Sequence, residues 1–312
     1  MTTSAPGPSP LGREEIASAG RRIAGLIRVT PVVDLGRALG DFDLVLKLEH
    51  LQVTGSFKAR GAFSAMTAMT GTAAVVAASG GNFGAAVAYA ASRLGRSATI
   101  FVPETSPSEK IERIRSHGAE VQVIPGYYDE ARRSAESFSR EQEATLLHAY
   151  DQTQVVAGQG TVAQELDSQV DADAVLVAVG GGGLIAGVAG WYQRDARVVA
   201  VEPEMCPCLH SALDAGRPVE VDVGGVAASS LGARVIGEHA WRARTLIDGS
   251  LLVGESAIVE AQRWLWEEAR LVVEPAAATT VAALRSGVYE PDKGSHVVAV
   301  LSGGNVDPGS VD

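Results

Sequence analysis

The sequence predicts an α/β fold built from open, twisted, mostly parallel sheets. Short apolar segments alternate with helix-forming segments along nearly all of the 312 residues. Several apolar segments contain no polar residue, as over residues 174–179, and such strands are typical of parallel sheets that are buried on both faces. Glycine-containing loops directly follow three of these segments, at the strand ends where open parallel sheets bind their ligands.

The expected elements follow in chain order. A helix over residues 14–27 ends before Thr30-Pro31, because a residue that precedes proline avoids the helical conformation. A strand over residues 44–48 leads to a helix over residues 59–69. The further strands are expected at 73–77, 98–102, 121–124, 174–179, 198–201 and 296–301. The further helices are expected at 83–94, 108–117, 128–143, 161–168, 255–269 and 275–284.

Composition excludes several classes of protein. The formal net charge of −11, without a basic cluster, argues against binding to nucleic acid or to an anionic membrane surface. No segment reaches the roughly 18 apolar residues of a membrane span. Residues 1–10 lack the features of a signal peptide, and we expect them to be a short disordered lead. The two cysteines, Cys206 and Cys208, suit a reducing compartment, so we expect a cytoplasmic protein.

Lys58 is the strongest candidate for a catalytic residue. It lies in the first turn of a predicted helix, and no acidic residue occurs in residues 52–61 around it. The positive end of the helix dipole and apolar surroundings both lower the pKa of a lysine, which favours the neutral amine that attacks carbonyl groups. A surface lysine at the start of a helix would occupy the same position in the sequence pattern. Position alone therefore leaves both interpretations open.

Four consecutive glycines form a second candidate site, the glycine loop, which comprises Gly180, Gly181, Gly182 and Gly183. The loop joins a predicted strand to a helix, where backbone N–H groups and the helix dipole favour a phosphate. The glycines also satisfy a dinucleotide fingerprint, with Glu202 about 20 residues on as the acid that binds a ribose. A dinucleotide-dependent oxidoreductase therefore stays open, although it leaves Lys58 unexplained.

Two further loops combine glycine with asparagine. The substrate loop, Ser79, Gly80, Gly81 and Asn82, suits a carboxylate, with a tight turn as the simpler explanation. The serine loop, residues 302–305, begins with Ser302 after the last predicted strand, where a C-terminal turn has the same appearance. Cys206, Cys208 and His210 lack a second pair of metal ligands, so a turn is the better explanation there.

The segment QVTGSFKARGA around Lys58 closely resembles the Schiff-base lysine motif of the fold-type II pyridoxal phosphate enzymes, the serine/threonine dehydratase family. The resemblance continues in motif order from about Thr30 to Asn305. It implies a small domain of residues 50–150 and a large domain of residues 1–49 and 151–312, with pyridoxal 5′-phosphate between them. It also implies a homodimer, and a chain without the regulatory extension of biosynthetic threonine deaminases.

The resemblance assigns roles to individual residues. Lys58 is the catalytic, cofactor-binding lysine; the substrate carboxylate is held by Ser79, Gly80, Gly81 and Asn82. The remaining cofactor contacts fall to Phe57, Asn82, Gly180, Gly181, Gly182, Gly183 and Ser302. Asn82 is expected at the phenolic oxygen of the cofactor and Ser302 at its pyridine nitrogen, while Phe83 replaces the family's histidine.

Three segments of the resemblance carry no catalytic assignment. Cys208 stands where some relatives have an aspartate that binds Mg²⁺ or Ca²⁺, and a thiol does not suit a hard cation, so we predict no metal. The segment that begins at Glu274-Pro275 resembles one near the cofactor in the family, and residues 158–161 resemble a turn.

The implied reaction is α,β-elimination from L-serine or L-threonine, which yields a 2-oxo acid and ammonia, with hydroxyaspartate left open. Racemisation needs a proton donor on each face of Cα, and the family's racemases have a serine at the position of Gly80. Glycine leaves only backbone and water there, so we expect D-serine as a minor product at most. A non-catalytic binding protein that kept the fold is the remaining class of function.

Overall fold

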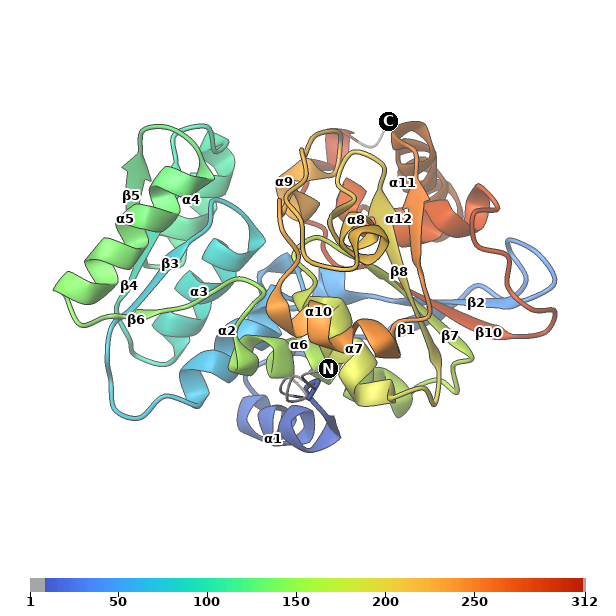
Figure 1. Cartoon of the computed structure of the whole chain (residues 1–312), viewed down its shortest axis with the longest axis horizontal. Coiled ribbons are helices and arrows are strands. Elements are labelled where there is room, and N and C mark those ends of the chain that lie inside the picture. The colour runs from blue at the N-terminus through green and yellow to red at the C-terminus, as the bar shows by residue number, and fades with distance from the viewer. Residues whose placement is uncertain (1–8, 311–312) are drawn as a thin grey trace, which may run out of the picture.

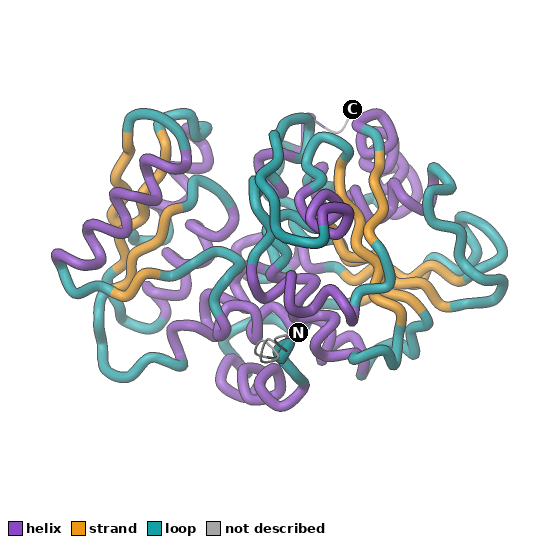
Figure 2. Tube along the Cα trace, in the orientation of Figure 1, coloured by secondary structure: helices purple, strands orange, loops and turns teal. Residues whose placement is uncertain are grey.

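The computed structural model describes residues 9–310, so the expected disordered lead lies outside the described residues over its first eight positions. The chain forms two sheets in two lobes (Figures 1 and 2). The six-stranded sheet has the order β1 (Val32–Asp34), β2 (Asp43–Lys47), β10 (His296–Val300), β7 (Ala174–Ala178), β8 (Arg197–Pro203), β9 (Ser250–Val253). The four-stranded sheet has the order β5 (Glu120–Ile124), β4 (Ala98–Pro103), β3 (Val75–Ala78), β6 (Thr145–Leu146). Every pair is parallel except β1 with β2, which confirms the predicted mostly parallel α/β fold.

Helices connect and cover the strands of both sheets. The α-helices are α1 (Arg13–Ile23), α2 (Lys58–Thr67), α3 (Asn82–Arg93), α4 (Ser108–Ser116), α5 (Tyr128–Glu141), α6 (Thr153–Asp167), α7 (Gly183–Tyr192), α8 (Cys208–Ala215), α9 (Ala228–Leu231), α10 (Glu238–Ala243), α11 (Glu255–Ala269) and α12 (Pro275–Arg285). The short 3₁₀ helices are η1 (Glu49–Leu51), η2 (Val53–Gly55), η3 (Arg244–Leu246) and η4 (Pro308–Ser310).

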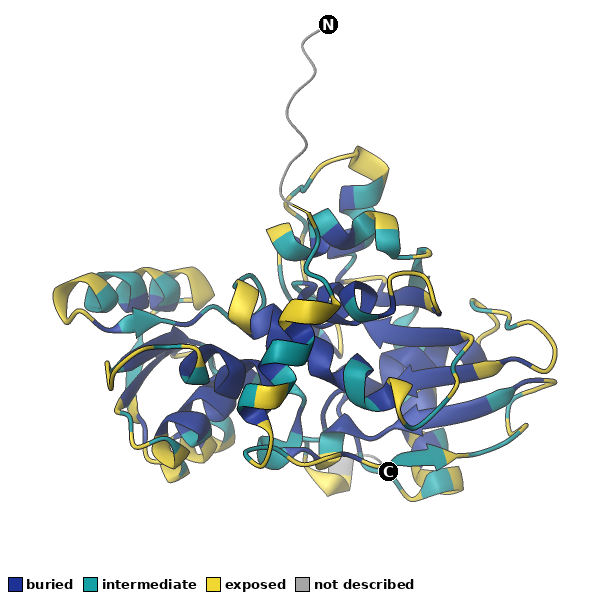
Figure 3. Ribbon diagram, turned by 90° about the horizontal axis from the view of Figure 1, so that it is seen from below, coloured by how far each residue is buried: buried dark blue, intermediate teal, exposed yellow. Residues whose placement is uncertain are grey.

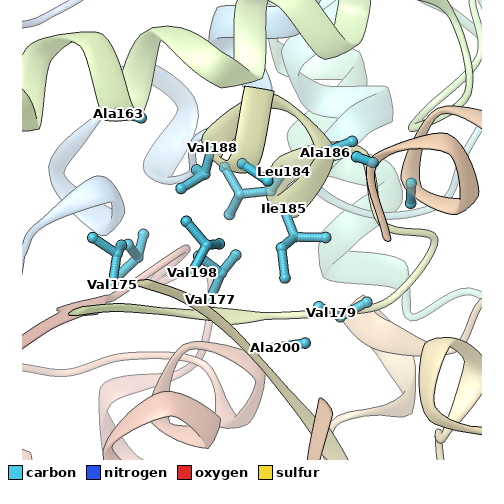
Figure 4. Close-up of a cluster of buried hydrophobic side chains, with 14 of the residues drawn as sticks. Ala163, Val175, Val177, Val179, Leu184, Ile185, Ala186, Val188, Val198 and Ala200 are labelled. Carbon is cyan, nitrogen blue, oxygen red and sulfur yellow. The ribbon is translucent and has the colours of Figure 1, made fainter. Parts of the chain in front are cut away.

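The apolar strand β7 is buried on both faces of the larger sheet. Successive side chains of a strand point to opposite faces, so Val175 and Val177 pack with Ile185 of α7 (Figure 4). Leu176 packs on the other face, with residues of α11 and α12. This two-sided burial explains why the strand carries no polar residue.

The smaller sheet is covered in the same way. Ile100 and Val102 of β4 pack with the small side chains of α2 and α3, whereas Phe101 packs on the other face with Ala131 and Ala135 of α5. Figure 3 shows the buried strands beneath helices whose outer faces are exposed. The substrate loop directly follows β3 and therefore leaves a buried strand.

Helix α6 differs most from the expected elements. It begins at Thr153, eight residues before the expected position, and contains the segment 158–161 that we expected to be a turn. That expectation is wrong because the glycines serve close packing: a Cβ on Gly158 would overlap Arg60 and Ser64 of α2, and a Cβ on Gly160 would overlap Ile16 of α1.

Other differences concern boundaries and short strands. Helix α1 ends at Ile23 rather than at residue 27, because Ala24 leaves the helical conformation and Gly25 has a φ of +78°. The short strands β1, β6 and β9 were not expected from the sequence.

The strands of the two sheets come from different parts of the chain. All strands of the smaller sheet lie between residues 75 and 146, and those of the larger sheet lie outside this range. The domain boundaries near residues 50 and 150 stay a prediction that fits this distribution. Within residues 9–310, no helix combines the length and the apolar character that a membrane crossing requires.

Candidate active site

Lys58 and Ser302 lie close together because their strands are neighbours. Strands β2 and β10 are parallel, so the segments that follow them meet at one edge of the larger sheet. The Phe57 N–H donates to Ser302 O at 3.1 Å, and the Gly304 N–H donates to Gly55 O at 3.0 Å. The serine loop is therefore fixed against the segment that carries Lys58.

Ser302 is a buried residue, at 7% exposure. Among the residues that the structure describes, its Oγ has no hydrogen-bond partner, and it is not among the fully enclosed unpartnered atoms. A buried hydroxyl without an internal partner fits the predicted contact with a heterocyclic nitrogen.

The ε-amino group of Lys58 is placed for chemistry rather than for an ion pair. Lys58 is the first residue of α2 and is half-buried. Its Nζ donates to Ala149 O at 3.2 Å and lies 4.9 Å from the centre of the Phe57 ring. Loss of solvent lowers the pKa of Lys58 to about 8, while the negative charge of Glu274 raises it. A substantial fraction of this amine is therefore neutral near pH 8.

Glu274 is a site residue to which the sequence assigned no role. Glu274 is buried, at 5% exposure, and its carboxylate accepts hydrogen bonds from Asn82 Nδ2 at 2.9 and 3.0 Å. It also accepts from Ser230 Oγ at 2.6 Å and from the Asn305 N–H at 2.8 Å. Glu274 thus joins the substrate loop to the serine loop and supplies a negative charge near Lys58.

Asn82 is held from both ends of its side-chain amide. Its Nδ2 donates to Glu274, and its Oδ1 accepts from Asn305 Nδ2 at 2.7 Å. Asn305 Nδ2 also donates to Thr54 O at 2.8 Å. One network therefore connects the start of α3, the serine loop and the segment before Lys58.

The glycine loop has no room for side chains. A Cβ on Gly181 would overlap the Tyr150 ring, and one on Gly182, whose φ is +85°, would overlap Ala240. A Cβ on Gly180 would lie 2.9 Å from Leu231, and one on Gly183 would lie 2.8 Å from Tyr150 O. Only glycine fits this close approach of the loop to Tyr150, Leu231 and Ala240.

The N–H groups of the glycine loop are free for an anion. Within residues 9–310, Gly181, Gly182 and Gly183 donate no hydrogen bond to a backbone or side-chain acceptor. The loop opens the ten-residue helix α7, whose positive end points toward it. Free N–H groups at a helix start fit a phosphate.

The segment of residues 148–151 connects Lys58 to the glycine loop, and no sequence signal indicated it. Ala149 accepts from Lys58, and the Tyr150 ring packs on Gly181. The ring of His148 lies edge-on to Tyr150 at 4.7 Å. His148 Nδ1 accepts from the Asp151 N–H at 3.0 Å, and burial lowers the pKa of His148, which favours the neutral imidazole.

The substrate loop leaves β3 at the edge of the smaller sheet. Ser79 donates its N–H to Phe101 O at 3.0 Å, and its Oγ accepts from the Gly81 N–H at 3.3 Å. A Cβ on Gly80 would overlap Ser106 Oγ, so a side-chain hydroxyl does lie beside this glycine. The expectation that only backbone and water occur there is therefore wrong.

Glu202 is used structurally. Its two oxygens accept from the N–H groups of Leu209 and His210 at 2.7 and 2.8 Å and from Ser250 Oγ at 2.6 Å. The buried carboxylate therefore caps α8, which accounts for an acid at this strand end without a ribose. Within the described part of the chain, no group of three or more histidine, cysteine, aspartate or glutamate residues is arranged for a metal ion. The absence of a metal stays a prediction.

Comparisons with known proteins agree with this arrangement. A family model described as "Pyridoxal-phosphate dependent enzyme" matches residues 23–303. A biosynthetic L-threonine dehydratase of Haemophilus influenzae is 35% identical over 94% of this chain, which spans 59% of that protein. A putative threonine dehydratase of Sinorhizobium fredii is 35% identical over 96% of this chain and 94% of its own length.

Solved structures show the same fold. A threonine deaminase from the organism abbreviated T.th. has a TM-score of 0.89 and 37% identity, and the alignment covers 95% of this chain and 99% of that chain. A serine racemase of maize has a TM-score of 0.91 and 30% identity, and the alignment covers 97% of this chain and 96% of the racemase chain.

Proposed function

The chain belongs to the family of pyridoxal-phosphate dependent enzymes, with pyridoxal 5′-phosphate as its cofactor, and we propose that it removes water and ammonia from a β-hydroxy amino acid. L-serine and L-threonine are the proposed substrates, and a 2-oxo acid is the organic product. One observation carries the proposal: Lys58, with a pKa of about 8, lies near the charge of Glu274, which is hydrogen-bonded to Asn82 of the substrate loop. The similarity to threonine dehydratases supports it.

Two loops that follow strands of the larger sheet fit the cofactor. The free N–H groups of Gly181, Gly182 and Gly183 suit its phosphate. Ser302 Oγ suits its pyridine nitrogen, to which a hydroxyl offers a hydrogen bond without a full charge. When bound, pyridoxal phosphate withdraws electrons from the amino acid and makes the Cα proton more acidic.

Lys58 is proposed to move the proton at Cα. Its neutral Nζ accepts that proton, and a pKa of about 8 is close to the pH at which such a base is most effective. Ser79 and the backbone N–H groups of the substrate loop hold the substrate carboxylate at the start of α3, a twelve-residue helix. Asn82, fixed by Glu274 and Asn305, orients the cofactor from the same loop.

A turnover assay tests the proposed function. The holoenzyme is incubated with L-serine, L-threonine or 3-hydroxyaspartate, and the 2-oxo acid and ammonia are both quantified. We expect equal amounts of the two products from L-serine or L-threonine, and none from the Lys58→Ala variant. A cofactor-loaded protein that releases neither product would instead be a non-catalytic binding protein.

The resemblance to the family also supports a homodimer in the cytoplasm. Both cysteines are free thiols, which suits a reducing compartment. Sedimentation of the holoenzyme tests the dimer, and a monomeric species at all concentrations would contradict it.

A further inference from the structure

Strand pairing brings Ser106 to the substrate loop. Strands β3 and β4 are parallel neighbours, with Ala78 opposite Phe101, so the loops that follow them leave the same edge of the sheet. After β4, the Ser106 N–H donates to Pro103 O at 2.9 Å and closes a turn. The sequence separates Ser106 from Gly80 by 26 positions, yet a Cβ on Gly80 would overlap Ser106 Oγ.

The Ser106 hydroxyl is available to a ligand. The side chain is half-buried. In residues 9–310 its Oγ neither forms a hydrogen bond nor belongs to the fully enclosed unpartnered atoms. By contrast, Ser79 Oγ accepts a hydrogen bond from the Gly81 N–H. Ser106 therefore contributes a free hydroxyl where Gly80 and Gly81 have no side chain.

This hydroxyl lies on the face of the molecule that holds the other site residues. A Cβ on Gly81 would lie 3.7 Å from Ser229 O of α9, so the substrate loop lies next to this helix. The next residue of α9, Ser230, donates to Glu274, which also accepts from Asn82. Ser106 therefore lies beside the loop whose Asn82 is hydrogen-bonded to Glu274.

Loss of a β-hydroxyl group needs a proton, because hydroxide is a poor leaving group. Lys58 Nζ takes a proton from Cα in the proposed reaction. Glu274 is bonded to three donors and accepts rather than donates. Ser79 is assigned to the substrate carboxylate in the proposed reaction, and the unbonded hydroxyl directly beside Gly80 is that of Ser106.

We propose that Ser106 Oγ donates a proton to the departing β-hydroxyl group, an inference that rests on the proposed elimination. The Cβ–O bond breaks, the electron pair stays with oxygen, and the proton from Ser106 completes a water molecule. Ser106 Oγ regains a proton from solvent, and the proton that Lys58 takes from Cα returns to solvent. The step involves no oxidation or reduction.

Two leaving groups test the role of Ser106. The Ser106→Ala holoenzyme is assayed with L-serine and with β-chloro-L-alanine, whose chloride leaves without a proton. We expect kcat/KM for L-serine to fall by about 100-fold and that for β-chloro-L-alanine to stay within about twofold. Ser106→Thr, which keeps a hydroxyl, should restore much of the L-serine activity. The matched control is Ser108→Ala, an exposed serine in the first turn of α4.

The outcomes separate the two proposals. An equal loss for both substrates, or no loss for L-serine, would overturn the role of Ser106. A selective loss of D-serine formation, with pyruvate formation unchanged, would show that Ser106 gives its proton to Cα and not to the leaving group. This result would also overturn the proposed role of Ser106. Failure of the unmodified holoenzyme to release pyruvate from either substrate would refute the elimination itself. Cofactor content, measured by absorbance, confirms that each variant is loaded.

Discussion

Two opposing effects set the charge of the Lys58 amino group. Loss of solvent lowers its pKa to about 8, and the carboxylate of Glu274 raises it. Because only the neutral amine attacks the carbonyl of the cofactor, the reactive fraction of apoprotein increases as the pH rises through about 8. Glu274 therefore has an electrostatic effect in addition to its hydrogen bonds.

The Glu274→Gln variant tests that effect. Without the negative charge, the ammonium form of Lys58 is less stable, so its pKa should fall below about 8. We expect the rate at which apoprotein takes up pyridoxal phosphate to reach half its maximum at a lower pH than in the unmodified protein. Stopped-flow absorbance measures this rate. Glu260→Gln, at an exposed position of α11, is the control, and an unchanged or higher midpoint in Glu274→Gln would contradict the effect.

Individual site residues could be predicted only where they belong to a motif of neighbouring residues in the sequence. The glycine loop and the substrate loop each directly follow an apolar strand, and Lys58 begins a predicted helix. In the structure Glu274 is hydrogen-bonded to Asn82 of the substrate loop and acts on Lys58 through its charge. Tyr150 and Ser106 reach the site through strand order and packing between distant segments. No local pattern indicates such contacts. Glu274 belongs to a recognisable motif, but the sequence does not show that its carboxylate binds Asn82.

Among the elements, the glycine loop depends on close backbone packing. The Gly181→Ala variant would force a methyl group into the Tyr150 ring and so displace either the loop or the ring. We expect the affinity for pyridoxal phosphate to fall at least about tenfold, on the order of 1.4 kcal/mol. Titration of apoprotein measures this change.

Gly254→Ala provides the matched control for that experiment. A Cβ on Gly254, before α11, would have only ordinary contacts with Glu204, at 3.7 Å or more. Equal affinity of Gly181→Ala and Gly254→Ala for the cofactor would show that the loop does not hold it.

The capping of α8 by Glu202 leads to a prediction about metals. Both carboxylate oxygens are hydrogen-bonded, and Cys208 is a buried thiol whose pKa is raised by burial. We expect EDTA to leave the turnover of L-serine unchanged. Loss of activity on chelation, restored by Mg²⁺ or Ca²⁺, would reveal an oxygen site elsewhere.

Element boundaries were predictable where hydrophobic periodicity ends in a clear stop signal. Helix α11 begins and ends at the expected residues, after Gly254 and before Arg270 in a left-handed conformation. The start of α6 was missed because Gly158 and Gly160 indicate a turn locally, whereas tertiary packing uses them in a helix. Strands such as β6, of two residues, are too short to show a period.

On the scale of the whole molecule, a buried ionic cluster connects the helix of Lys58 to the larger sheet. Arg60 Nη2 lies 2.7 Å from Glu49 Oε1 and 3.1 Å from Glu165 Oε2, and Lys47 Nζ lies 2.6 Å from Glu165 Oε1. The cluster has two positive and two negative groups, and Lys47, Glu49 and Arg60 are fully buried. It fixes β2, α2 and α6 relative to one another.

The Arg60→Met variant tests this connection. It leaves Glu49 buried without its partner, so the free energy of unfolding should fall by about 3–5 kcal/mol. Arg133→Met is the control, because the exposed pair of Arg133 with Glu130 should contribute about 0–1 kcal/mol. Urea denaturation measures both free energies of unfolding. Equal decreases in the two variants would show that the buried cluster stabilises the fold no more than an exposed ion pair does.

The central claim is that Lys58 binds the cofactor, and peptide mapping after borohydride reduction tests it most directly. The chain has only four lysines, Lys47, Lys58, Lys110 and Lys293. Lys47 is paired with Glu165, and the side chain of Lys293 is 88% exposed, so these two serve as internal controls for a buried and an exposed amine. We predict a stoichiometric pyridoxyl adduct on Lys58 alone, and a stoichiometric adduct on any other lysine would contradict the account.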